Sequence, residues 1–244
     1  MRIKKAQPIF IEGNDIAVLL LHSFTSHTRD MKALAETIHQ SFGFTCLVPL
    51  FSGHGQEAEA LISYTIDDWW EDALGSYEDL ANQYKQVVVI GLSVGGIFAL
   101  KLAQQFPVAR IVVMSVPIDR PPLELKQRTI DYANRYKKLE NKSEQQIEEE
   151  LKQFHSLSID SFERFQQFIY ETMDELGEIT APIAVYYGGR DEAVYEESAL
   201  EIEGSVSSVR VDLKKFENSS HLMTLSKEKD SLYEQILEFL SPIV

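Results

Sequence analysis

Ser93 stands in the pentapeptide Gly-Leu-Ser-Val-Gly, residues 91–95, directly after the β-branched run 87–90. The run predicts a buried strand and residues 97–103 predict a helix, so the serine falls at a sharp strand-to-helix turn. So tight a turn needs small residues beside the serine, which accounts for the two glycines. The pattern predicts a serine hydroxyl held clear of the sheet at the N-terminus of a helix. The alternative is an ordinary turn that happens to contain a serine.

A serine hydroxyl becomes a nucleophile when a base takes its proton and a third group orients that base. Histidine suits the role of base because its pKa lies near neutrality. In a strand–turn–helix architecture of this kind, the acid and then the histidine follow the serine on later strand-end loops. Of the six histidines, only His155 and His221 follow Ser93. His155 falls in a helical region, whereas His221 follows the last predicted strand, so we predict His221 as the base.

Asp191 is the predicted acid. It leaves the predicted strand 183–187 through Gly188-Gly189, and these glycines are expected to let the backbone turn sharply and aim the carboxylate along the sheet edge. A turn-capping aspartate is the alternative. Four other carboxylates are weaker candidates, because they lie in a helical region, beside Asp191, or on a strand face expected to point to solvent: Asp160, Asp174, Glu192 and Asp212.

Acyl transfer also requires donors for a developing oxyanion. The backbone N–H of Val94, directly after the serine, is one expected donor, and the loop 22–26 after an earlier strand is expected to supply the other. His22 and His54 are predicted to brace their loops through hydrogen bonds.

Strands alternate with helices along most of the chain, which predicts an α/β fold with a mostly parallel sheet covered on both faces. Loops 22–27, 50–56 and 91–95 leave the carboxyl ends of strands, where such sheets bind ligands. Strands are expected at 8–12, 17–21, 45–50, 86–90, 110–114, 183–187 and 206–213, and helices at 29–40, 65–82, 97–106, 198–203 and 227–239.

The alternation breaks between residues 117 and 177, where no strand is predicted and charged helical sequence follows Pro121-Pro122. We predict a core domain of residues 1–116 and 178–244, with a helical cap (lid) insertion at 117–177. The acidic run 148–150 indicates a solvated helix face. Apolar residues later in the segment recur at helical spacing and are expected both to pack on the core and to line a pocket: Phe154, Phe162, Phe165, Phe168, Ile169 and Met173.

The chain carries 38 acidic and 23 basic side chains, a formal net charge of −15. This balance argues against binding to nucleic acid or to an anionic membrane surface. The single cysteine, Cys46, excludes an intramolecular disulfide. The N-terminus lacks a secretory apolar region and the longest apolar run, 16–21, is too short to span a bilayer, so we expect a cytoplasmic protein. No cofactor or metal site is expected, and a homodimer is left open.

Five motifs in this order give the chain its resemblance to a known family: Leu-Leu-His-Ser-Phe-Thr-Ser (20–26), Ser-Gly-His-Gly (52–55), Gly-Leu-Ser-Val-Gly-Gly (91–96), Gly-Gly-Arg-Asp (188–191) and Ser-Ser-His (219–221). The chain resembles the α/β-hydrolases, and more closely the small bacterial carboxylesterases and monoacylglycerol lipases. The resemblance implies hydrolysis of short- to medium-chain carboxylic esters through an acyl-enzyme. It implies roles for five residues: Ser93 as nucleophile, Asp191 as acid, His221 as base, and the backbone amides of Phe24 and Val94 as the oxyanion hole.

The chain departs from the family pattern in the loop after the second strand, where Ser23 and Ser26 replace the usual glycines. Because glycine supports unusual backbone angles near the substrate, serine predicts either strain or a different loop path, with consequences for the Phe24 donor. A thioesterase, amidase or C–C hydrolase would use the same three side chains. A non-catalytic binder of small ligands is the remaining alternative.

Overall fold

A seven-stranded sheet forms the centre of the protein, in the order β1-β3-β2-β4-β5-β6-β7. The computed structural model describes residues 5–243. β1 is antiparallel to β3, and the other neighbouring strands are parallel. The strands are β1 Ile9–Ile11, β2 Ile16–Leu21, β3 Thr45–Val48, β4 Gln86–Leu92, β5 Arg110–Met114, β6 Ile183–Gly188 and β7 Val211–Phe216.

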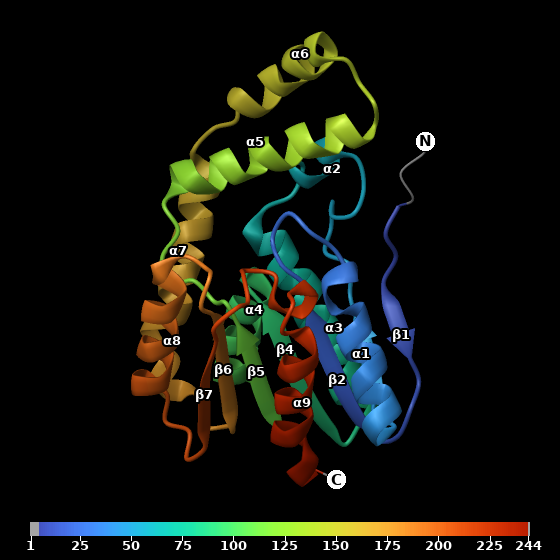
Figure 1. The fold of residues 1–244 in the computed structure, drawn as a ribbon. Helices are drawn as coiled ribbons and strands as arrows, with labels where there is room; N and C mark the ends of the chain where they lie inside the picture. The colour runs from blue at the N-terminus through green and yellow to red at the C-terminus, as the bar shows by residue number, and fades with distance from the viewer. Residues whose placement is uncertain (1–4, 244) are drawn as a thin grey trace.

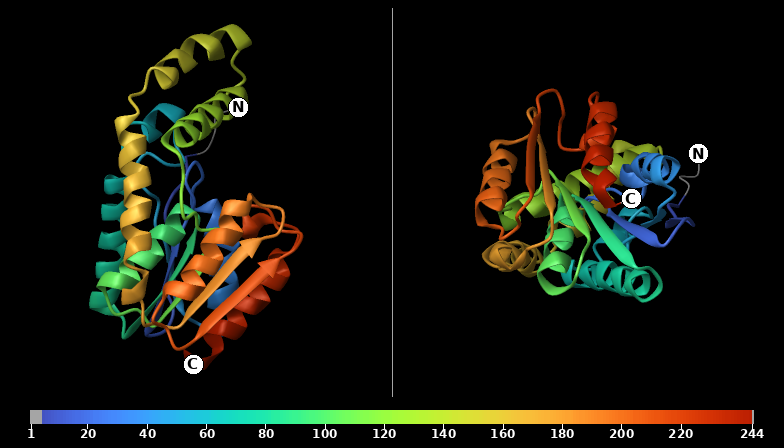
Figure 2. Two further views of the ribbon diagram at one scale, coloured as in Figure 1. Left: turned by 90° about the vertical axis from the view of Figure 1, so that its left-hand side faces the viewer. Right: turned by 90° about the horizontal axis from the view of Figure 1, so that it is seen from below.

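Helices cover both faces of the sheet (Figure 1 and Figure 2). The side chains of α1 and α9 pack on one face, and those of α3, α4, α7 and α8 pack on the other. This layering confirms the predicted α/β fold. Among residues 5–243, no helix is long and apolar enough to cross a membrane. The helices are α1 Arg29–Phe42, α2 Ala58–Leu61, α3 Ile66–Gln83, α4 Val94–Gln105, α5 Pro122–Leu139, α6 Glu144–His155, α7 Asp160–Asp174, α8 Ala193–Ser205 and α9 Lys229–Leu240.

The central strands are apolar nearly throughout because both of their faces are covered. β5 and β6 are buried at every position, and β2 and β4 at every position but the first. Burial on both faces explains why these strands read as continuous apolar runs rather than as alternating patterns. Since the strands are parallel, the loops that follow β2, β4, β6 and β7 emerge at one edge of the sheet, below α5 (Figure 1).

Two predicted boundaries near the C-terminus were wrong. Helix α8 begins at Ala193 rather than at residue 198, and β7 begins at Val211 rather than at residue 206. The alternation that suggested an earlier strand includes Val209, whose side chain is 98% exposed. Val206 instead closes α8, since its N–H donates to the carbonyl of Ile202. The four-residue helix α2 was not predicted, because so short an element leaves no periodicity to read.

Segment 117–177 folds into α5, α6 and α7, as the absence of a strand pattern predicts. α5 and α6 lie above the carboxyl ends of the strands, and α7 runs down beside the sheet (Figure 1). Side chains of α7, among them Phe168 and Ile169, belong to the same buried cluster as the sheet, whereas Phe154 of α6 lies in a separate small cluster with α2 and α5. The division into a core domain and a cap stays a prediction.

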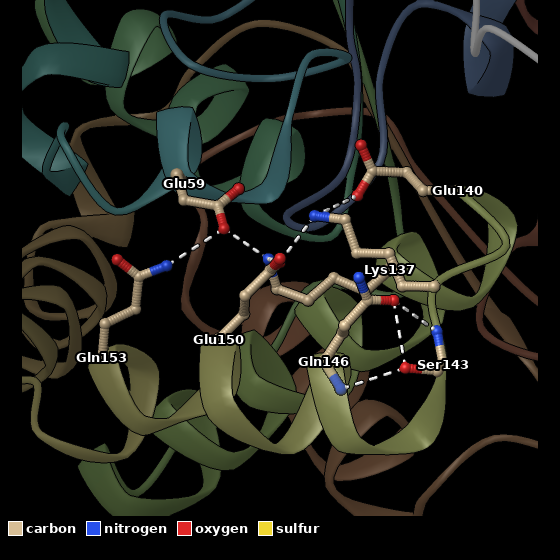
Figure 3. A network of polar contacts seen from close by, with 8 residues as sticks. Glu59, Lys137, Glu140, Ser143, Gln146, Glu150 and Gln153 are labelled. Atoms are coloured by element: carbon tan, nitrogen blue, oxygen red, sulfur yellow. Dashed lines mark hydrogen bonds and ion pairs between the residues drawn. The ribbon is translucent and has the colours of Figure 1, made fainter.

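A buried lysine ties α5 to its neighbours (Figure 3). Lys137 is fully buried, and its ammonium group pairs with Glu59 of α2 and with Glu150 of α6, the latter at 2.7 Å. Lys142 pairs with the same Glu150 carboxylate at 2.6 Å. The amide of Gln153 donates to Glu59 at 3.0 Å. Because a buried charge is costly without partners, these pairs hold α2, α5 and α6 in one arrangement.

Replacing Lys137 by methionine is expected to lower the free energy of unfolding by about 1–3 kcal/mol, because Glu59 and Glu150 then face each other without the cation between them. Urea denaturation measures the effect. Lys138→Met is the matched control, since that neighbouring side chain is exposed and should change stability by less than about 0.5 kcal/mol. Equal effects of the two substitutions would contradict this account of the network.

Candidate active site

Ser93 occupies the turn between β4 and α4 with a strained backbone, φ 57° and ψ −117°. Non-glycine residues seldom adopt positive φ, and such strain persists where the surrounding structure imposes it. The turn is held by the N–H of Ser93, which donates to the carbonyl of Met114, and by the Ser93 carbonyl, which accepts from the N–H groups of Gly96 and Ile97. The serine is 7% exposed and lines a cavity at the sheet edge.

The two glycines of the pentapeptide are required by close backbone contacts. A Cβ at Gly91 would lie 2.1 Å from the carbonyl oxygen of Gly95. A Cβ at Gly95 would lie 2.2 Å from the carbonyl oxygen of Leu21 on β2. The need for small residues here, expected from the tight turn, is confirmed.

His221 and Asp191 form a hydrogen-bonded pair. The Nδ1 of His221 lies 2.9 Å from Oδ2 of Asp191, whose other oxygen accepts from the N–H of Glu192 at 3.0 Å. The Asp191 side chain is 5% exposed, against 27% for His221. The ring of His221 also packs on that of Tyr195, with centroids 4.6 Å apart. An ionised carboxylate in this position places the imidazole proton on Nδ1 and leaves Nε2 as an acceptor.

Gly188 and Gly189 were expected to allow a sharp turn before Asp191, but the structure shows a different reason for glycine at these positions. Neither has a positive φ, so they are not needed for an unusual turn. Their lack of a side chain instead lets the loop before His221 approach closely: a Cβ at Gly188 would lie 2.5 Å from the carbonyl of Ser219, and one at Gly189 would lie 2.8 Å from Glu217. This approach brings the loops of β6 and β7 together. The expectation for Asp212 was also wrong: its carboxylate accepts from the hydroxyl of Tyr186 at 2.7 Å.

Ser93 and His221 line one cavity of about 420 Å³. Within residues 5–243 no hydrogen bond joins the two side chains. Catalytic hydrogen bonds are often long before substrate binds, so this separation is compatible with proton transfer in a complex. The fold thus gathers Ser93, Asp191 and His221 at one edge. His155 does not line this cavity.

The two amides expected to form an oxyanion hole belong to residues of the same cavity, Val94 and Phe24. Val94 is the first residue of α4, so its N–H has no partner within the helix. The hydrogen bonds found within the described chain include none from the N–H of Phe24. The Phe24 ring packs between Trp69 and Phe165, with centroid separations of 5.5 and 5.2 Å. Neither amide therefore has a hydrogen-bond partner within the described chain.

The serines that replace glycine in this loop are held by a buried carboxylate. The hydroxyls of Ser23 and Ser26 each donate to Asp30, at 2.6 Å, and Asp30 is fully buried in the first turn of α1. Ser23 does not adopt positive φ; the strained residue is Thr25, with φ 48°. Asp30 therefore spans the loop on both sides of Phe24 and fixes its path without glycine.

His22 braces this loop from below, as predicted. Its Nδ1 lies 3.0 Å from the carbonyl of Ser23, and its Nε2 accepts from the N–H of Phe51 at 3.2 Å. These contacts require the neutral ring with its proton on Nδ1. Burial lowers the pKa of His22 to about 4, and burial together with the nearby His22 lowers the pKa of His54.

Acid is therefore expected to destabilise the fold through His22. Its pKa is about 4 in the folded protein and 6.5 in the unfolded chain, so below pH 6.5 the unfolded chain binds a proton that the folded protein excludes. The stability present above pH 6.5 is lost as the pH falls toward 4, a total of about 3 kcal/mol. Urea denaturation from pH 7 to 5 measures the slope. His22→Gln should have a slope smaller by about 1 kcal/mol per pH unit, and an unchanged slope would contradict the assignment.

Several residues of the site were not anticipated from the sequence. Asp30 could have been noticed from its four-residue spacing to Ser26 at a helix start. Arg128 and Arg135 line the cavity from α5 and are seven residues apart, which places them on one helix face. Tyr195 and Arg120, also in the lining, carry no local sequence signal. Among residues 5–243 there is no group of three or more His, Cys, Asp or Glu side chains arranged to hold a metal ion.

Known proteins resemble this chain along nearly its whole length. It is 35% identical to a carboxylesterase of Bacillus subtilis (strain 168), covering all of this chain and 99% of the relative. It is 26% identical to a thermostable monoacylglycerol lipase of Bacillus sp. (strain H-257), covering 97% of this chain and 94% of that protein. A solved structure from work on the metagenome-derived lipolytic enzymes LipS and LipT shares the fold, with a TM-score of 0.80 at 20% identity, over 99% of this chain and all of that one.

The model of one protein family, described as serine aminopeptidase S33, matches residues 13–230. The match spans the turn between β4 and α4 at Ser93 and the loops that carry Asp191 and His221. With the sheet order, the strained serine and the two Bacillus relatives, it identifies the chain as a member of the serine aminopeptidase S33 family of α/β-hydrolases.

Proposed function

We propose that this protein is a serine esterase that cleaves short- to medium-chain carboxylic esters with a triad of Ser93, His221 and Asp191. The observation that carries the proposal is the 2.9 Å contact between His221 and Asp191 at the cavity that holds Ser93. The assignment to carboxylic ester hydrolases is further supported by the carboxylesterase and monoacylglycerol lipase relatives.

In the first half of the reaction, Oγ of Ser93 attacks the ester carbonyl carbon while Nε2 of His221 takes the hydroxyl proton. Asp191 keeps the imidazole in the required tautomer and stabilises its charged form. The tetrahedral intermediate then expels the alcohol, which receives the proton from His221. Ser93 is left as an acyl ester.

In the second half, water attacks the acyl carbonyl carbon and gives its proton to His221. The bond to Oγ breaks, Ser93 recovers its proton, and the carboxylic acid leaves. In both halves the N–H groups of Val94 and Phe24 would donate to the oxyanion, a contribution of about 3–4 kcal/mol per donor in comparable sites. Asp30 supports this step by fixing the path of the loop that carries Phe24.

The shape of the site supports an acyl chain of modest length. Phe24 and Phe165 line both the main cavity and a second, smaller cavity of about 110 Å³ whose other lining residues are largely apolar. A short alkyl chain fits such a volume, whereas a long one would have to displace side chains. We propose that segment 117–177, which supplies Phe165 and Leu125 to the lining, acts as a cap that sets acyl preference.

A panel of substrates tests the proposal. Kinetics are measured with p-nitrophenyl esters of increasing acyl length, monoacylglycerols, acyl thioesters and anilides at matched acyl length. The expected result is the highest kcat/KM for oxygen esters of short to medium length. Faster turnover of thioesters or anilides would reassign the reaction, and binding of esters without turnover would favour a non-catalytic role.

A further inference from the structure

Four arginines line the cavity that contains Ser93: Arg29, Arg120, Arg128 and Arg135. No aspartate or glutamate belongs to the lining of this cavity. The concentration of positive charge is unexpected in a chain with a net charge of −15. An ester of a simple uncharged alcohol carries no anionic group that could pair with these guanidinium groups.

Two of these arginines are organised by one carboxylate outside the lining. Glu192 pairs with Arg120 at 2.7 Å and also with Arg128. Glu124 adds a longer contact to Arg120, at 3.5 Å. Arg29 and Arg135 form no ion pair with any other residue of the described chain. The guanidinium groups of Arg29 and Arg135, which are both exposed, are therefore open to an anion that enters the cavity.

Arg120 is the most buried of the four arginines. The residue is 5% exposed, and its Nη2 is buried without a hydrogen-bond partner in the structure. Its guanidinium lies over the ring of Tyr195, 4.6 Å from the centroid, and that ring packs in turn on His221. Arg120 therefore places a positive charge, held by Glu192 and Tyr195, in the wall of the cavity.

The stack of Arg120, Tyr195 and His221 places the positive charge on the histidine side of the site. His221 is the group that would protonate the departing alcohol, so the alcohol portion of the ester lies on that side. The apolar side chains around Phe24 and Phe165 line the smaller cavity beside the loop 22–26 and suit the acyl chain. The alcohol portion of the ester would thus face positively charged side chains, and the acyl portion would face apolar ones.

Two of the four arginines, Arg128 and Arg135, lie on one face of α5. Lys137 on the same helix is held between Glu59 and Glu150, which anchors α5 to α2 and α6 (Figure 3). The backbone that carries these two arginines is thereby held in place, and the Arg128 guanidinium is further held by Glu192.

We infer that the substrate is an ester whose alcohol portion carries an oxyanion, a carboxylate or a phosphate, bound by Arg120, Arg128 and Arg135. Guanidinium groups bind both anions through charge-assisted, often bidentate hydrogen bonds. The inference rests on the proposed esterase function, since it names the substrate class of that site.

Three pairs of esters test the inference, each comparing a charged substrate with an uncharged counterpart. O-hexanoyl lactate against O-hexanoyl lactamide places a carboxylate on the alcohol side. Hexanoyl glycerol phosphate against hexanoyl glycerol places a phosphate there. Monoethyl adipate against ethyl hexanoate places the carboxylate on the acyl side. We expect kcat/KM to favour the charged ester by about tenfold or more in one or both alcohol-side pairs, less at high salt, and not in the acyl-side pair.

Arg128→Gln and Arg135→Gln are each expected to reduce the charged-to-uncharged ratio of kcat/KM by about tenfold. Arg210→Gln is the matched control, because Arg210 lies outside the cavity against Phe239, and its ratio should equal that of the wild type. A ratio near one in every pair, a ratio that the cavity variants leave unchanged, or a preference only on the acyl side would overturn the inference. Failure of the esterase proposal looks different, because neither the charged nor the uncharged esters would then be hydrolysed.

Discussion

Replacing Ser93 by alanine is expected to lower kcat for ester hydrolysis by roughly 10⁶-fold, because removing the nucleophile disables the whole triad while binding and oxyanion stabilisation remain. The substitution deletes one oxygen atom from a side chain that is 7% exposed. Alanine meets the same strained backbone as serine at this position. The fold should therefore be kept while the chemistry is lost. Steady-state kinetics with a p-nitrophenyl ester measures the change.

Ser76→Ala is the matched control for this prediction. The hydroxyl of Ser76 donates to the carbonyl of Asp72 within α3 and does not line the cavity, so its loss should leave kcat within about twofold of the wild type. Urea denaturation of both variants establishes that they are folded. Ester turnover retained in folded Ser93→Ala would mean that another residue supplies the nucleophile.

Replacing Gly95 by alanine is expected to destabilise the protein by about 3 kcal/mol or more, or to prevent folding. The added Cβ would lie 2.2 Å from the carbonyl oxygen of Leu21 and 2.8 Å from that of His22. Both neighbours are backbone atoms, so no side-chain rotation relieves the clash. β2 would have to move away from the turn between β4 and α4, which would also displace the loop 22–26 that carries Phe24. The free energy of unfolding in urea, or the yield of folded protein, measures the effect.

Gly75→Ala is the opposite case within the same chain. Gly75 lies in the middle of α3, and a Cβ there would meet nothing within 4 Å. Because glycine is a poor helix former, alanine should stabilise the protein by up to about 1 kcal/mol. A Gly95→Ala variant as stable as Gly75→Ala would contradict the packing described for the turn between β4 and α4.

The parts of the fold that could be predicted are those in which local sequence and tertiary structure agree. The run 87–90 before Ser93 is apolar at every position because β4 is buried on both faces. Gly91 and Gly95 cannot be replaced by larger residues, because a Cβ at either position would clash with backbone atoms. The order of Ser93, Asp191 and His221 follows from the order of the strands. A parallel sheet then brings their loops to one edge.

The features that escaped prediction depend on tertiary contacts rather than on local sequence patterns. Asp30 could not be tied to Ser23 without knowing that the start of α1 folds back on the loop before it. The reason for Gly188 and Gly189 lies in the approach of the loop before His221, not in their own turn. Arg120 gains its position from Tyr195 and Glu192, which are more than seventy residues away in the sequence. The hydrophobic pattern and the spacing of residues in the sequence do not indicate such contacts.

Reaction of the protein with a fluorophosphonate, followed by mass spectrometry of the intact chain and of its peptides, tests whether Ser93 is the nucleophile. Such reagents phosphonylate a serine that a neighbouring base has activated. We expect one adduct per chain, located on Ser93, with loss of ester turnover in proportion to labelling. An adduct on a different side chain, or full turnover in a protein that remains unlabelled, would contradict this expectation.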